Sequence, residues 1–141
     1  MRSGEGSDFP GVMLARMAYT VLRLDELEWS KPSAGDQSRG IVRLSDRMRH
    51  MRANIWRLPP GTSGRRHAER VQEEIFVVLE GTATMALGDP PQRVELTAGS
   101  AVIVEPGTAL QQRNESPRDA VILAIGAPRE EPGNADYFPD A

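Results

Sequence analysis

Residues 61–81 read GTSGRRHAERVQEEIFVVLEG, and the expected fold follows from this segment. His67 and Glu69 are two residues apart, so on a β-strand both side chains point to the same face. The run that begins at Glu74 is apolar on both faces, with residues 76 and 78 on one side and residues 75, 77 and 79 on the other. Such a strand is predicted to lie buried in the middle of a sheet. A buried carboxylate at its start is unfavourable unless a cation, a metal ion or a proton accompanies it.

On either side of this segment the sequence consists of short apolar or alternating runs, which are separated at regular intervals by glycine and proline. Strands are predicted at residues 20–24, 41–44, 48–58, 67–69, 74–80, 82–87, 92–96, 101–104, 110–114 and 120–125. No segment of useful length between residues 40 and 127 has helical periodicity. Short strands at this spacing predict an all-β sandwich or barrel.

The chain is predicted to form one domain with irregular ends, because its 141 residues suffice for a single hydrophobic core. Residues 1–16 contain several glycines and serines and are expected to be a disordered lead, with Met17 as an alternative start. Residues 17–127 make up the predicted β-domain. The proline-rich tail at residues 128–141 carries Tyr137 and Phe138, which are expected to dock on that domain.

The composition excludes several kinds of site. There is no cysteine, which excludes disulfides, thiolate zinc sites, iron–sulfur clusters and cysteine nucleophiles. His50 and His67 are the only histidines, so no site can use three of them. A formal net charge of -3 disfavours nucleic acid as a partner, and the longest apolar run is too short to cross a membrane. Without a hydrophobic signal segment, the expected location is the cytoplasm.

The arginines are unevenly distributed along the chain. Residues 39–70 contain nine arginines, at positions 39, 43, 47, 49, 52, 57, 65, 66 and 70, against Asp46 and Glu69. One interpretation is that alternating strands point these side chains into solvent, where they pair with acidic neighbours. The other is a basic rim that attracts an anionic small molecule.

Two motifs in this sequence resemble those of the cupin superfamily. Gly61, His67, Glu74 and Gly81 match the spacing of its first motif, and residues 99, 107 and 114 match its second. The resemblance implies a jelly-roll-like barrel of two antiparallel sheets with a central pocket. It also implies a homodimer made by exchange of N-terminal strands, with residues 19–24 as the donor.

The resemblance further implies a divalent metal on three histidines and a glutamate, but this chain departs from that pattern. Glu69 takes the place of the second histidine, and Leu110, which has no lone pair, takes that of the last. Three hypotheses remain open. The first is a reduced metal site on His67, Glu69 and Glu74, with manganese, iron, nickel or zinc as candidates and an amide oxygen from Gln112 as a further donor.

The second hypothesis is a site without metal or other cofactor, in which Glu69 and Glu74 share a proton and act as general acid and base. The third is a vestigial pocket that binds a ligand or nothing. If Glu69 instead turned outward to pair with Arg65 or Arg66, His67 and Glu74 would be left alone.

The expected function is binding, and conversion if the site is active, of a small polar or anionic metabolite such as a sugar derivative or a carboxylate. The residues expected to line the pocket are Phe76, Leu110, Gln112 and Asn114. The alternative is a non-catalytic ligand-binding or sensing barrel. Neither hypothesis involves a nucleic acid or a membrane.

Overall fold

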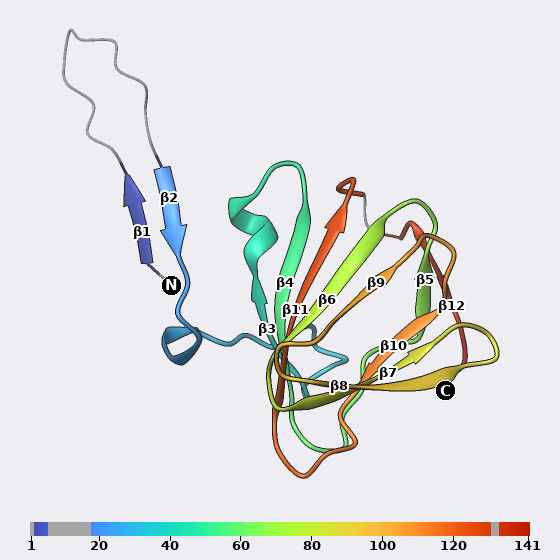
Figure 1. Cartoon of the computed structure of the whole chain (residues 1–141). Coiled ribbons are helices and arrows are strands. Elements are labelled where there is room, and N and C mark those ends of the chain that lie inside the picture. The colour runs from blue at the N-terminus through green and yellow to red at the C-terminus, as the bar shows by residue number, and fades with distance from the viewer. Residues whose placement is uncertain (1, 6–17, 131–132) are drawn as a thin grey trace, which may run out of the picture.

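The computed structural model describes residues 2–5, 18–130 and 133–141, and two five-stranded antiparallel sheets form its body (Figure 1). The first sheet has the order β3-β4-β11-β6-β9, with bounds Gly40–Arg43, Arg52–Leu58, Ala120–Ala127, Glu73–Glu80 and Ala101–Val104. The second has the order β12-β5-β10-β7-β8, with bounds Ala135–Tyr137, His67–Glu69, Leu110–Arg113, Thr82–Leu87 and Gln92–Thr97. The all-β fold with two antiparallel sheets is therefore confirmed.

The helical content of the described residues is two 3-10 helices, η1 (Leu24–Glu26) and η2 (Leu44–Arg47). No helix in this described part of the chain is long and apolar enough to cross a membrane.

The hydrophobic core lies between the two sheets and closes one end of the space between them. Its largest fully buried members come from both sheets, and they include Leu58, Phe76, Met85, Leu110 and Ile122. These positions alternate with outward-facing residues along their strands, as the sequence pattern predicts. Because Phe76 and Leu110 also line the cavity described below, the core forms the base of the site.

Strand β6 is central in the first sheet, between β11 and β9, but the prediction that both its faces are buried is wrong. Phe76 and Val78 on the inner face are buried, whereas Leu79 on the outer face is 38% exposed. The other outer residues of β6 are half-buried. Within one chain, nothing among the described residues covers this end of the outer face completely.

The strands predicted at residues 41–44 and 48–58 are separated by more of the chain than expected. Strand β3 ends at Arg43, residues 44–47 form η2, and β4 begins at Arg52, where it pairs with Gly126 of β11. The Ser45 hydroxyl accepts a hydrogen bond from the Ala53 amide (2.8 Å) and donates one to the Ala53 carbonyl (3.0 Å). The Ser45 side chain is therefore the hydrogen-bond partner of Ala53, directly after the last β3–β4 pair, Arg43 with Asn54.

The two ends of the chain differ in how they relate to the barrel. Strand β1 (Arg2–Glu5) pairs with β2 (Ala18–Val21) in a hairpin that stands away from the barrel (Figure 1). The strand at residues 2–5 was not predicted; the rest of the expected disordered lead, and Met17, lie outside the described residues. At the other end β12 pairs with β5, so the tail docks on the second sheet.

Candidate metal and ligand site

A cavity of about 780 Å³ opens between the two sheets, beyond the hydrophobic core. Its buried lining residues form a floor, which includes Phe76, Leu110, Gln112, Glu69 and Glu74. Its exposed lining residues form a mouth, which includes residues 43, 46, 49, 65, 129 and 137. The cavity therefore joins a partly apolar, partly acidic floor to a mouth rich in arginine.

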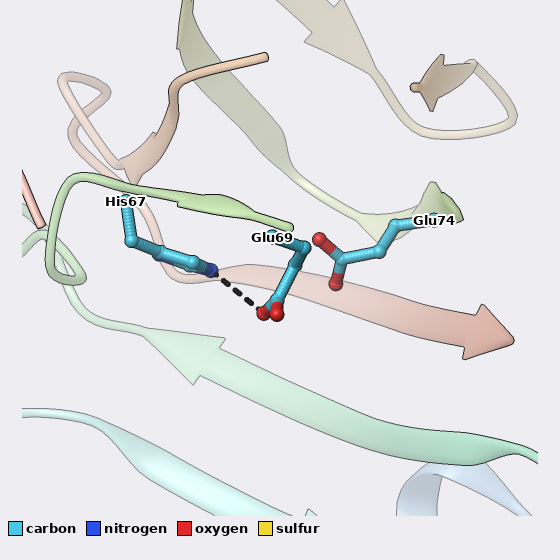
Figure 2. A group of neighbouring side chains, drawn as sticks. All are labelled: His67, Glu69 and Glu74. Atoms are coloured by element: carbon cyan, nitrogen blue, oxygen red, sulfur yellow. Dashed lines mark ion pairs between the residues drawn. The ribbon is translucent and has the colours of Figure 1, made fainter. Parts of the chain in front are cut away.

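Strands β5 and β6 bring the three predicted site residues together at the cavity wall. His67 and Glu69 lie on β5, two residues apart and therefore on one face, and Glu74 lies at the start of β6 in the opposite sheet. One ligand atom from each residue lies within 4.8 Å of the other two. Figure 2 shows the three side chains directed toward one another. The structure thus assembles His67, Glu69 and Glu74 into one group.

Glu69 faces the cavity, and its partners are inside it. Its Oε1 lies 3.3 Å from His67 Nε2 and 3.5 Å from Arg52 Nη1, and its side chain is only 5% exposed. The outward pairing with Arg65 or Arg66 does not occur. Arg66 instead donates to the Gly88 and Pro139 carbonyls and to Asp89.

The ring of His67 is oriented by its other nitrogen. Nδ1 lies 3.0 Å from the Arg65 carbonyl oxygen, which can only accept a hydrogen bond, so Nδ1 carries the hydrogen. Nε2 is therefore directed at Glu69 and the cavity. Burial opposes protonation of His67, but the hydrogen bonds to Glu69 and to the Arg65 carbonyl, with the charges of Glu69 and Glu74, raise its pKa above the ordinary value.

The two carboxylates titrate in opposite directions. The hydrogen bond from His67, reinforced by the charges of Arg52 and His67, lowers the pKa of Glu69 although burial acts against this. Burial first, and then the negative charge of Glu69, raises the pKa of Glu74 to about 7. One carboxylate is thus held ionised while its neighbour is disposed to keep a proton near neutral pH.

The donor set fits a divalent cation. In the part of the chain that the structure describes, Glu74 Oε1 and Gln112 Oε1 are buried without a hydrogen-bond partner. A buried acceptor with no donor is unfavourable, and a cation relieves it. One imidazole, held by a backbone carbonyl on its far side, and two carboxylates make an oxygen-rich set that suits manganese, iron or magnesium better than copper.

The remaining predicted pocket residues divide into two groups. Phe76, Leu110 and Gln112 line the cavity, with Leu110 directly opposite His67 in the β5–β10 pairing. Asn114 does not line it, and this prediction is wrong. Its side-chain amide donates to the Leu58 and Arg118 carbonyls, both at 2.7 Å, and its oxygen accepts from Ser116, so Asn114 is committed to a turn.

The arginine-rich region contributes to the cavity only in part. The arginines that line it are those at positions 39, 43, 49, 52, 65 and 129. Arg57 and Arg70 point elsewhere and contact Trp29 and Asp136. Sequence reasoning missed two further lining residues: Tyr137 reaches the cavity because β12 pairs with β5, and Arg129 follows β11 and donates to the Ser45 and Met48 carbonyls. Nothing in the local sequence marks them.

Comparisons with known proteins agree with this architecture. A family model described as Cupin domain matches residues 54–126, and a comparison with curated proteins found no match. Three similar solved structures are informative about the fold. One is described as a sugar phosphate isomerase from a cupin superfamily, from Silicibacter pomeroyi, with 24% identity, a TM-score of 0.67, and coverage of 79% of this chain and 76% of that chain.

The second is the polyketide cyclase RemF from Streptomyces resistomycificus, with 16% identity, a TM-score of 0.71 and coverage of 87% of each chain. The third is KdgF from Halomonas sp., with 17% identity, a TM-score of 0.64, and coverage of 80% of this chain and 96% of that chain. At these identities the similarity shows the fold alone.

Proposed function

This chain belongs to the cupin family, and we propose that its cavity holds one divalent cation on His67, Glu69 and Glu74 and takes a small polar or anionic metabolite. The observation that carries the proposal is the group of three ligand atoms within 4.8 Å of one another, two of them from buried carboxylates. Two such carboxylates cannot both ionise in a shared cavity without a compensating charge. A cation supplies that charge to both.

The chain's own residues define what happens around this group. Arg52 lies against Glu69 and supports its ionised form, while the Arg65 carbonyl fixes which nitrogen of His67 is free to bind. Phe76 and Leu110 exclude water from the floor, which strengthens electrostatic interactions there. A bound divalent cation would act as a Lewis acid that polarises an oxygen of the ligand.

The kind of ligand follows from the lining of the cavity. Gln112 offers an unpartnered amide oxygen at the floor, which suits a hydroxyl-bearing molecule. The arginines at the mouth favour a negative charge on the ligand. One structure of similar fold is described as a sugar phosphate isomerase, and a phosphorylated sugar combines both chemical features.

A second candidate function is favoured by a separate observation. The pKa of Glu74 is raised to about 7 beside an ion pair between His67 and Glu69. Without a metal, Glu74 would hold a transferable proton at neutral pH, and the site would act as a metal-free acid–base pair.

Metal analysis distinguishes the two functions. The protein is purified without chelator for elemental analysis, and chelator-treated protein is then titrated with manganese, iron(II), nickel and zinc by calorimetry. We expect one equivalent of metal in the wild type and its loss in Glu74→Gln. Glu73→Gln is the matched control, because Glu73 precedes Glu74 on β6 but is exposed on the opposite face. A wild-type protein that binds none of the four metals would exclude the cation site and leave the acid–base pair.

A further inference from the structure

We infer that the mouth of the cavity is an anion subsite, in which Arg43, Arg49, Arg65 and Arg129 bind a phosphate or carboxylate group of the ligand. This deepens the proposed function, on which it rests for the nature of the floor. The ligand would then have two ends. Its polar, uncharged part reaches His67, Glu69 and Glu74, and its anionic group stays among the arginines.

The first evidence is how the six cavity arginines are paired. Arg39 has its charge matched by Asp36, with Nη2 2.6 Å from Oδ2, and Arg52 lies 3.5 Å from Glu69. The other four form no ion pair with any carboxylate in the described part of the chain. Exposed arginines away from the cavity, such as Arg47 and Arg118, also lack an ion pair among the described residues, so what distinguishes these four is that they gather around one cavity with their charges available to an anion.

The second evidence is that three of these four guanidinium groups are positioned by uncharged partners. Arg129 Nη1 donates to the Ser45 and Met48 carbonyls at 2.8 and 2.6 Å, and Arg43 Nη2 donates to the Pro32 carbonyl at 2.8 Å. Arg65 lies over the ring of Tyr137, 3.7 Å from its centroid. These contacts hold the groups in place and leave both the positive charge and several N–H donors available, which lowers the entropic cost of binding an anion.

The acidic residues of the mouth offset only part of this charge. The described acids that line it are Asp46 and Glu130, and Glu130 Oε2 accepts a hydrogen bond from the Asn134 amide (2.8 Å), which leaves its negative charge in place. Four arginines against these two acids leave an excess of positive charge at the mouth. The negative charge of Glu69 and Glu74 lies at the floor, where it is proposed to face a cation.

The third evidence is where the subsite lies in the chain. His67, Glu69 and Glu74 fall within residues 54–126, which match the family model. Arg43, Arg49 and Arg129 fall outside them and reach the cavity from β3, the segment after η2, and the tail. The floor thus lies within the region that matches the family model, whereas most of the anion subsite lies outside that region.

The test uses metal-free, full-length protein and three probes at constant ionic strength: inorganic phosphate, succinate and uncharged glycerol. Binding is measured by calorimetry and by the shift of the melting temperature. We expect phosphate or succinate, but not glycerol, to bind the wild type. Each of Arg49→Gln, Arg65→Gln and Arg129→Gln should weaken that binding about tenfold, the usual effect of losing one charge-assisted hydrogen bond.

Two control variants separate the subsite from general charge. Arg47→Gln removes the same charge from η2, next to the mouth, and Arg118→Gln removes it from a distant exposed loop; neither residue lines the cavity. Both should bind the anions as the wild type does. Arg129→Gln also breaks two hydrogen bonds, to the Ser45 and Met48 carbonyls. Arg49→Gln is therefore the decisive variant, because Arg49 forms no hydrogen bond or ion pair with the described part of the chain.

Stronger binding of phosphate than of succinate would identify a phosphoryl group, the reverse order would identify a carboxylate, and both support the inference. Binding of neither anion, or equal anion affinity in Arg49→Gln, Arg65→Gln and Arg47→Gln, would overturn it. The floor is tested separately, because Glu74→Gln should abolish metal binding yet change the affinity for phosphate by less than about twofold. Metal binding without anion binding defeats only this inference, and anion binding without metal binding defeats only the proposed cation site.

Discussion

Leu110 occupies the position at which a fourth metal-binding side chain is missing beside His67, Glu69 and Glu74. It lies directly opposite His67 across the β5–β10 pair, lines the cavity and is 1% exposed. We predict that Leu110→His adds a nitrogen donor to the group and raises metal affinity at least about tenfold, which corresponds to roughly 1.4 kcal/mol. Calorimetric titration of the chelator-treated protein with manganese or zinc measures the change.

The matched control for this change is Leu110→Ala, which loses the same packing without gaining a donor. Both variants should lose about 2–4 kcal/mol of stability in the absence of metal, because Leu110 belongs to the core. Only Leu110→His should regain stability when metal is added. Equal metal affinity in both variants would show that His67, Glu69 and Glu74 do not converge on a common ion.

Glu74 gives the metal-free protein a characteristic dependence of stability on pH. Its pKa is about 7 when folded and 4.5 as the unperturbed value, so between these pH values the folded form keeps a proton that the unfolded form has lost. Stability therefore decreases as the pH rises through this window, by up to about 3 kcal/mol for a shift of this size. Chemical denaturation of chelator-treated protein from pH 4.5 to 7.5 would show the decrease.

The variant Glu74→Gln should remove most of that decrease, and Glu73→Gln should not. With a saturating divalent cation the wild-type trend should reverse, because the metal binds the deprotonated carboxylate and stabilises the fold more as the pH rises. A wild-type profile as flat as that of Glu74→Gln would show that Glu74 does not keep its proton in the folded protein.

At the scale of the elements, most strands could be predicted because their alternation and the glycines between them are local properties. The end of the β3–β4 pairing could not, since there the Ser45 hydroxyl bonds to Ala53, a partner eight residues away. The outer face of β6 was predicted to be buried because its residues are apolar, but hydrophobicity does not say what covers a face.

The residues of the candidate site also divide into those that local sequence predicts and those that it does not. His67, Glu69 and Glu74 could be predicted because they lie on two strands that are consecutive in the chain, at spacings that match a known motif, and the two opposite sheets bring them to one cavity. Asn114 matched a motif position, yet its amide serves a turn. Tyr137 was expected to dock on the barrel, but its place at the cavity could not be predicted, because it depends on the pairing of β12 with β5, a contact between distant parts of the chain.

That pairing depends on Arg66, the buried arginine before β5. Its guanidinium donates to the Gly88 carbonyl (2.9 Å) and the Pro139 carbonyl (3.2 Å), and it lies 5.1 Å from the Phe138 ring centroid. We predict that Arg66→Ala lowers stability by about 1–3 kcal/mol, since it removes a buried side chain whose guanidinium bonds to the Gly88 and Pro139 carbonyls. Hydrogen exchange should show faster exchange in residues 133–141.

Arg70 offers the contrasting control, because it contacts the same tail through an ion pair with Asp136 in which both side chains are more than half exposed. Such surface pairs contribute little to stability. We therefore expect Arg70→Ala to leave stability and tail exchange unchanged. Similar effects of both substitutions would show that Arg66 does not anchor the tail.

At the scale of the whole molecule, two apolar surfaces are left open by the residues that the structure describes. Residues 24–30 and η2 cover one half of the outer face of the first sheet, where Leu27, Trp29 and Leu44 pack against it. The other half ends at the edge strand β9, where Ile103 is 72% exposed. The second surface is the hairpin that stands away from the barrel, on which Tyr19 is 62% exposed.

We propose that a second copy of the chain covers both surfaces, as in the homodimer that the sequence leads us to expect. A symmetric dimer contains each residue twice, so Ile103→Glu would remove two buried side chains from one interface. At about 1.5–3 kcal/mol for each buried isoleucine, the substitution should weaken association about a hundredfold or more.

Sedimentation velocity over a range of protein concentrations measures the dissociation constant, and Ile103→Val is the conservative control. We expect a dimer for the wild type and Ile103→Val and a monomer for Ile103→Glu. A monomeric wild type at every concentration, or a dimer that persists in Ile103→Glu, would show that this face does not join two copies.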